Sequence, residues 1–267
     1  MTGRETGCCD CGGQKGEIVK LRLFLVMAST AFCLDATVAA NQAPVVPRGA
    51  DGKPDLQGTW QVLNTAAWDI QEHSAALGIP GGRGVVEGNE IPYRPEAEAQ
   101  RHANFEKRGT EDPVKKCYLP GVPRITYMPF PFQIFQTPRY TVMAYEWGHV
   151  ARTIFTDGSK HPDQIDFWMG DSRGRWDGDT FVVDVANFND QTWFDAAGNF
   201  HSDALHVVER YTLTGPDHMD YEVTIEDAKV FARSWKMTMV LYRRKEPNPQ
   251  LVEYACAADL VNETDAR

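Results

Sequence analysis

Histidines and carboxylates concentrate in one part of the chain, residues 157–210. His161 lies in a turn-rich segment and Asp171 opens a Gly-Asp-Ser sequence. His201 and Asp203 lie in a loop that leads into a run with strand alternation. A histidine can accept or donate a proton near neutral pH when a carboxylate orients its ring. We therefore expect acid–base chemistry, with His161 or His201 moving a proton and Asp171 or Asp203 orienting it.

Glu209 has the most unusual position among the carboxylates. By period-two alternation it shares a face with four apolar or aromatic residues of its strand: Leu205, Val207, Tyr211 and Leu213. A carboxylate on such a face must be paired, protonated or used in chemistry. Arg152 is directed inward by the same alternation, so two interpretations stay open. Glu209 is either a catalytic carboxylate or one half of a buried ion pair.

A metal site is an alternative for the same region. His201-x-Asp203-x-x-His206 supplies three metal-binding side chains within six residues. The spacing matches no established metal motif, however, and strand alternation turns His206 away from Asp203. A third interpretation is that these polar groups only cap loops and turns. Nucleophile motifs such as Gly-x-Ser-x-Gly are missing, and so are glycine-rich phosphate loops, so we expect no cofactor.

Short strands must position these residues. Candidates after the first strand at 55–63 are 133–137, 140–147, 150–156, 179–187, 204–214, 219–227, 235–244 and, at the end, 251–256. Strands and helices do not alternate along the chain, which disfavours a parallel α/β sheet. The pattern predicts an all-β fold, an antiparallel up-and-down barrel of about eight strands or a closed sandwich, with an N-terminal loop and short-helix extension.

The inward faces of these strands are rich in Met, Tyr and Trp. Such a stripe is either a packed core or the wall of a pocket for a small apolar or aromatic molecule, which a barrel of this size can hold. The candidate substrate-binding residues are Tyr145, Trp147, Arg152, Tyr211, Met237, Met239 and, from the loop, Trp193.

The first forty residues have the pattern of a targeting region. Lys20 and Arg22 precede an apolar run at 23–34, and small residues follow up to Ala40. Twelve apolar residues reach about 18 Å as a helix, too short for a bilayer core of roughly 30 Å. We expect a cleaved signal peptide at about 19–40, an over-called start upstream of it, and a periplasmic or secreted protein.

The remaining chain is long enough for one domain. Residues 41–54 are expected to be a tether, 55–260 a single barrel domain that includes the extension 64–132, and 261–267 a tail. Within the extension, 95–108 has helical composition, and the proline-punctuated run 119–132 is expected to lie extended on the surface. The net charge of −10 disfavours nucleic acid as a partner.

Two cysteines, Cys117 and Cys256, remain after the targeting region is removed. An even pair in an oxidising compartment is expected to form a disulfide, since neither belongs to a catalytic-cysteine or Cys-x-x-Cys motif. Closing a loop of about 140 residues would disfavour the unfolded chain by roughly 4 to 5 kcal/mol in the entropic model.

Gly58-Thr59-Trp60 resembles the Gly-x-Trp signature of lipocalins. In that family the Trp packs at the closed barrel end beneath an Arg from the last strand, and Arg243 is placed for that role. The resemblance implies a structural Trp60–Arg243 contact, with cation–π stacking.

A wider resemblance spans roughly residues 55 to 260. The stretches DPVKKCYLPGVPR, FTDGSKHP, GDSRGRWDGDTFVVDVANFND, WFDAAGNFHSDALHVVERY and EYACAADL resemble a large family of secreted bacterial proteins with no established activity. That resemblance includes both cysteines, which supports the disulfide.

Three classes of function follow from these patterns. The first is a cofactor-independent lyase, isomerase or hydrolase that handles a small apolar or aromatic molecule by proton transfer. The second is a lipocalin-like protein that binds a hydrophobic ligand without chemistry. The third is an interaction protein with a filled barrel interior.

Overall fold

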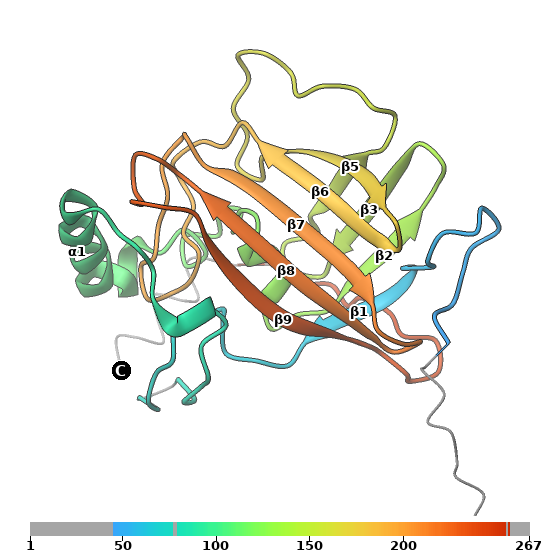
Figure 1. Ribbon diagram of the computed structural model, residues 1–267. Coiled ribbons are helices and arrows are strands. Elements are labelled where there is room, and N and C mark those ends of the chain that lie inside the picture. The colour runs from blue at the N-terminus through green and yellow to red at the C-terminus, as the bar shows by residue number, and fades with distance from the viewer. Residues whose placement is uncertain (1–44, 77–78, 255, 257–267) are drawn as a thin grey trace, which may run out of the picture. The chain divides into compact units, whose positions relative to one another are not determined.

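A computed structural model describes residues 45–76, 79–254 and 256. The expected signal peptide and the tail at 261–267 lie outside the described residues. Within the described part of the chain, nine strands follow one another around a closed barrel (Figure 1). They are β1 (Gly58–Val62), β2 (Phe132–Gln136), β3 (Tyr140–Tyr145), β4 (Ala151–Phe155), β5 (Asp171–Asp177), β6 (Thr180–Ala186), β7 (His206–Leu213), β8 (His218–Glu226) and β9 (Trp235–Arg243). The predicted all-β closed barrel is confirmed.

The barrel encloses an apolar core because side chains alternate between its inner and outer faces. On β7 every second residue from Val207 to Leu213 is buried, and β8 and β9 show the same period. β9 pairs with β1 through Trp60 and Arg243, which completes the ring of hydrogen bonds. Because a closed sheet has no free edges, every strand in the ring has two neighbours.

One pair of neighbouring strands departs from the antiparallel pattern. β4 and β5 run parallel and are joined only at Ile154↔Ser172 and Phe155↔Arg173. A parallel pair needs a long connection, which here is residues 156–170. β5 was not among the predicted strands, because its sequence DSRGRWD lacks an apolar alternation. Among the described residues of the predicted strand at 251–256, Tyr254 forms a bridge to Trp147.

The extension between β1 and β2 holds the one α-helix of the described chain, α1 (Pro95–Glu111), which lies beside one end of the barrel (Figure 1). It also holds two 3-10 turns, η1 (Glu87–Asn89) and η2 (Arg124–Tyr127). The expectation of an extended surface segment at 119–132 is wrong, because all four residues of η2 are buried. Tyr127 donates to the Phe194 carbonyl at 2.7 Å, and Arg124 forms a buried bidentate pair with Asp112.

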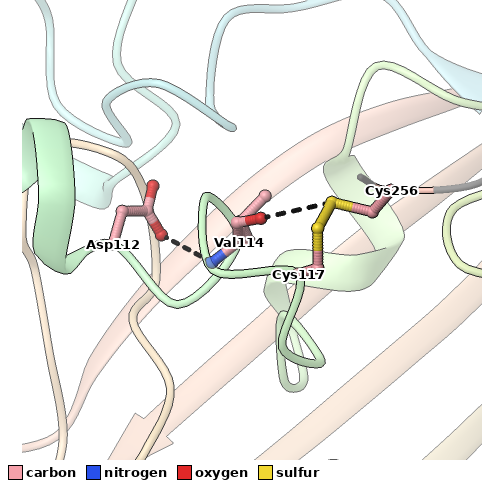
Figure 2. Close-up of a disulfide and its surroundings, with 4 residues drawn as sticks. All are labelled: Asp112, Val114, Cys117 and Cys256. Atoms are coloured by element: carbon pink, nitrogen blue, oxygen red, sulfur yellow. Dashed lines mark hydrogen bonds between the residues drawn. A yellow bond between two sulfur atoms is a disulfide. The ribbon is translucent and has the colours of Figure 1, made fainter. Parts of the chain in front are cut away.

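The predicted disulfide is confirmed. Cys117 and Cys256 are bonded, with Cα atoms 5.5 Å apart and a sequence separation of 139. Figure 2 shows that Cys117 belongs to the turn that follows α1, where Asp112 accepts a hydrogen bond from the Val114 amide at 3.0 Å. The disulfide therefore ties the extension to the end of the described chain.

The contact that the lipocalin signature implies is present. The Arg243 guanidinium lies over the Trp60 ring, 4.3 Å from its centre, and Arg243 Nε donates to the Pro216 carbonyl at 2.7 Å. Gly58 has a φ of +123°, and a Cβ there would collide with the Arg243 guanidinium. Both the backbone conformation and this close approach require glycine at the position. None of the described helices is long and apolar enough to span a membrane.

Candidate functional site

The inward-facing Glu209 and Arg152 meet inside the barrel. Glu209 is fully buried and Arg152 is 4 % exposed. Arg152 Nη1 donates to Glu209 Oε1 at 3.2 Å, and Nη2 donates to Oε2. Arg152 Nε donates to Ser172 Oγ at 3.0 Å. Two parallel N–H···O bonds of this kind fix both the distance and the plane of the two groups.

Two tyrosine hydroxyls complete the surroundings of this carboxylate. Tyr211 and Tyr221 both donate to Glu209 Oε1, at 2.9 and 2.6 Å. Burial raises the pKa of both tyrosines, and the nearby Glu209 charge raises it further. Burial alone would lower the pKa of Arg152, but the Glu209 charge reverses this and holds it well above its usual value. The geometry is that of a closed ion pair whose oxygens already have partners. We call Glu209, Arg152, Ser172, Tyr211 and Tyr221 the inner cluster.

Other residues predicted to bind substrate belong to the packed core. Tyr145 is 3 % exposed, and its hydroxyl donates to Met143 Sδ at 3.3 Å beside the inner cluster. Met237 and Met239 are buried on β9. Trp147 packs against Tyr254, with ring centres 4.9 Å apart. These side chains are buried in the hydrophobic core.

His161 and Asp171 meet on the outside of the barrel. His161 Nδ1 lies 2.7 Å from Asp171 Oδ2, and His161 Nε2 lies 2.8 Å from Asp184 Oδ1. Arg173 fixes the Asp171 carboxylate with Nε at 2.6 Å and Nη2 at 2.9 Å. The Asp171 side chain is 8 % exposed and that of His161 is 26 % exposed. Both ring nitrogens of His161 therefore contact carboxylates, while part of the ring stays accessible to solvent.

A second histidine extends these contacts across the sheet. His206 Nε2 lies 3.1 Å from Asp184 Oδ2, and His206 Nδ1 lies 3.2 Å from Glu226 Oε2. We call Asp171, His161, Asp184, His206 and Glu226 the outer row. Burial lowers the pKa of His206, but hydrogen bonds to Glu226 and Asp184 raise it by more. Burial raises the pKa of Asp184, and the two histidines more than offset this, so the pKa lies below its usual value.

His161 borders a surface hollow of about 500 Å³. The hollow is lined by Gly158, Ser159, Lys160, His161, Arg173, Gly174, Arg175 and Asp184. Its charged lining carries more cations than carboxylates, although the whole chain has a net charge of −10. The potential inside the hollow therefore favours a negatively charged solute.

The remaining residues predicted to do chemistry lie apart from one another. His201 is 2 % exposed and is held by Thr192 Oγ1 at 2.6 Å and by the Ser202 carbonyl at 2.8 Å, and burial lowers its pKa. Asp203 pairs with Lys229 at 2.5 Å on the surface. His206 belongs to the outer row, so the alternative metal site at His201, Asp203 and His206 is not assembled. Within residues 45–76, 79–254 and 256, no other group of three such side chains could hold a metal ion.

Trp193 lines a groove of about 630 Å³ between α1 and the loop after β6.

Sequence reasoning missed several residues that contact the predicted site residues, above all Asp184 and Arg173. Asp184 had a detectable signal, because it is the one charged residue in the apolar strand Thr180–Ala186. Arg173 had none, since β5 itself was not predicted.

None of the family models, curated proteins or solved structures compared with this chain matches it. Its function is therefore argued from the geometry of its own side chains. The inner cluster has its hydrogen bonds satisfied internally, whereas the hollow beside His161 and the groove beside Trp193 offer polar groups to a solute.

Proposed function

We propose that this protein is an exported, cofactor-independent enzyme that transfers a proton to or from a small anionic molecule. The observation that carries the proposal is the Asp171–His161 contact of 2.7 Å on the wall of the 500 Å³ hollow. A histidine oriented by a buried carboxylate and reachable by a solute is the usual arrangement for general acid–base catalysis.

The working atom in this proposal is His161 Nε2. Asp171 holds Nδ1 and is itself held by two guanidinium nitrogens of Arg173. Nε2 faces Asp184 Oδ1 at a distance of 2.8 Å. In the proposed reaction, Nε2 takes a proton from an acidic C–H bond of the substrate and then returns it to the resulting carbanion or to a leaving oxygen. A substrate that binds at His161 Nε2 would displace Asp184 from that nitrogen. Asp184 would then keep its hydrogen bond to His206.

The hollow's lining supports a small organic anion as substrate. Within the described residues, the side chains of Lys160 and Arg175 have no hydrogen bond or ion pair, and both line the hollow beside His161. An unpaired lysine and arginine bind carboxylate or phosphate well. The proposed substrate is therefore an anion at this surface hollow, in place of the apolar molecule expected inside the barrel. Lyase, isomerase and hydrolase reactions are all compatible with a single histidine that accepts and donates a proton.

Proton exchange into a bound substrate provides a test that needs no knowledge of the whole reaction. Small carboxylic acids with an acidic C–H, both aliphatic and aromatic, would be incubated with the protein in heavy water and followed by proton NMR. We expect catalysed deuterium uptake or turnover of at least one acid, and loss of this activity in His161→Gln.

The matched control is His102→Gln on α1, which should retain full activity. His102 is exposed, with 66 % of its side chain accessible, and pairs only with Glu98. Arg175→Gln should raise KM more than it lowers kcat. Activity that survives in His161→Gln would contradict the proposal. Saturable binding without exchange would instead support the second candidate, a binding protein without chemistry.

A further inference from the structure

We propose that the groove beside Trp193 is a second binding site, which takes a neutral saccharide. The groove lies between α1, the turn at 113–118 and the loop at 190–193, and its volume of about 630 Å³ is typical of small-molecule sites. It shares no lining residue with the hollow beside His161. The inference therefore stands independently of the proposed enzyme activity.

Two aromatic side chains, Trp193 and Tyr118, line the groove. The Trp193 turn is held firmly: its neighbour Thr192 contacts His201 Nε2 at 2.6 Å, and the Phe194 amide donates to the Asn199 carbonyl at 2.7 Å. A rigid aromatic face offers flat apolar area together with a polar edge. The C–H face of a sugar ring is a suitable partner for such a surface.

Amide side chains supply the polar part of the lining. Gln100 donates to Asn104 Oδ1 at 2.7 Å, and Asn104, which is 8 % exposed, donates to the Gly198 carbonyl at 3.2 Å. Gln191 lines the groove from the facing loop. An amide both donates and accepts hydrogen bonds, and so does every sugar hydroxyl. Prepositioned amides therefore match a polyhydroxylated ligand better than an apolar one.

The charges of the lining cancel. Two lysines, Lys107 and Lys116, stand against two carboxylates, Glu111 and Asp190. Lys116 and Glu111 already pair at 2.6 Å. A balanced lining gives no preference for an anion or a cation, in contrast to the cationic hollow beside His161. A neutral ligand is therefore favoured.

The disulfide fixes one wall of this groove. Cys117 lies between the lining residues Lys116 and Tyr118 and is bonded to Cys256 (Figure 2). Reduction would release this wall from its covalent anchor. Saccharide binding should then depend on an oxidised protein, whereas the His161 hollow has no such link.

Calorimetric titration of the full mature chain would test the proposal. The probes are neutral glucose and N-acetylglucosamine oligosaccharides up to about 10 mM, with benzoate and choline as charged comparisons. We expect saturable binding of at least one oligosaccharide, weakened about tenfold or more by Trp193→Ala and less by Trp193→Phe. Reduction with dithiothreitol should also weaken it. A pull-down with insoluble polysaccharide distinguishes a wall glycan from a free sugar.

Matched variants keep this test separate from the enzyme proposal. Tyr140→Ala removes an aromatic side chain that is 43 % exposed and does not line the groove, and it should leave saccharide affinity unchanged. His161→Gln should likewise leave it unchanged. Absence of binding to every oligosaccharide, or equal loss in Trp193→Ala and Tyr140→Ala, would overturn the inference whatever the exchange experiment gives.

Discussion

The inner cluster and the outer row place charged groups on opposite faces of the same strands. Glu209 lies on the inner face of β7 and His206 on the outer face, three residues away along the strand. Glu209 is fully buried and accepts hydrogen bonds from Arg152, Tyr211 and Tyr221, whereas the His206 side chain is 37 % exposed.

The inner cluster and the outer row differ in whether their groups can exchange a proton with solvent. A buried ion pair contributes little net stability, yet losing one partner leaves an uncompensated charge and is costly. A half-exposed imidazole between carboxylates can gain or lose a proton at modest cost. The inner pair is therefore costly to break, whereas the outer contacts leave their imidazole rings accessible to solvent.

The largest expected effect comes from breaking the inner pair. Glu209→Gln removes the counter-charge of buried Arg152 and should lower the free energy of unfolding by about 3–5 kcal/mol. Thermal and urea unfolding measure this. Glu222→Gln, on the outer face of β8 and paired with Lys236, is the control and should change little. A Glu209→Gln variant as stable as wild type would show that the pair is dispensable for the fold.

A second buried carboxylate, Asp195, sharpens the comparison because it lacks a directly bonded cation. Burial, with a further contribution from Asp69, raises its pKa to about 7. The ordinary unfolded value is about 3.9, so the folded state holds the extra proton between these values. Protonated Asp195 contributes fully to the stability of the folded state below about pH 4, and this contribution is lost as the pH rises to about 7. The free energy of unfolding falls by a few kcal/mol over that range.

Asp69→Asn tests this dependence, since it removes the neighbouring charge and keeps an oxygen for the Gln71 amide. Urea unfolding at about pH 5 and about pH 8 should show that the variant gains stability relative to wild type mainly at the higher pH. An equal change in stability at both pH values would show that the Asp69 charge does not influence the protonation of Asp195.

Ser172→Ala should have an intermediate effect. It leaves Arg152 Nε buried without its acceptor at 3.0 Å, which should cost about 1–3 kcal/mol. Chemical denaturation measures the loss, and Ser172→Thr, which retains a hydroxyl, is the comparison variant. A neutral effect of the alanine would mean that the inner cluster relaxes around the missing hydroxyl.

The smallest effect is expected in the outer row. The folded pKa of His206 is raised, so its stabilising contribution is present below the unfolded value of about 6.5 and is lost as pH rises through the folded pKa. Because the side chain is more than a third exposed, His206→Gln should cost less than about 1 kcal/mol at low pH. The free energies of unfolding of variant and wild type should converge at alkaline pH. A difference in stability that is the same at every pH would contradict a raised pKa of His206.

The sequence was most informative where strands alternate strictly. The period-two alternation of residues 204–213 predicted that Glu209 faces the barrel interior, and the same reasoning predicted that Arg152 does too. The structure shows the two side chains in contact there. The Gly58-Thr59-Trp60 pattern located the Arg243 contact, and two remaining cysteines located the disulfide. Local periodicity is sufficient for the first of these inferences, whereas the Trp60–Arg243 contact was implied by the resemblance to lipocalins and the disulfide by the number of cysteines.

Partners brought together by irregular chain were not predictable in the same way. His161 reaches Asp171 and Asp184 because residues 156–170 fold back over the sheet, and no periodic pattern encodes that path. The groove beside Trp193 likewise depends on where α1 packs. The helix itself was expected at 95–108, but its neighbours were not. Proline spacing suggested exposure for 119–132, whereas tertiary packing buried η2.

The parallel step between β4 and β5 bears on how such a protein could acquire new activities. Antiparallel neighbours can be joined by two residues, which leave no spare chain, but a parallel step obliges the chain to travel back across the barrel. The returning segment, 156–170, carries His161, which contacts β5 through Asp171 and β6 through Asp184. Its length and composition can change by insertion or substitution while the strand register on either side stays as it is. The irregular connection between the two parallel strands is thus a part of the barrel that can change without altering the strands on either side.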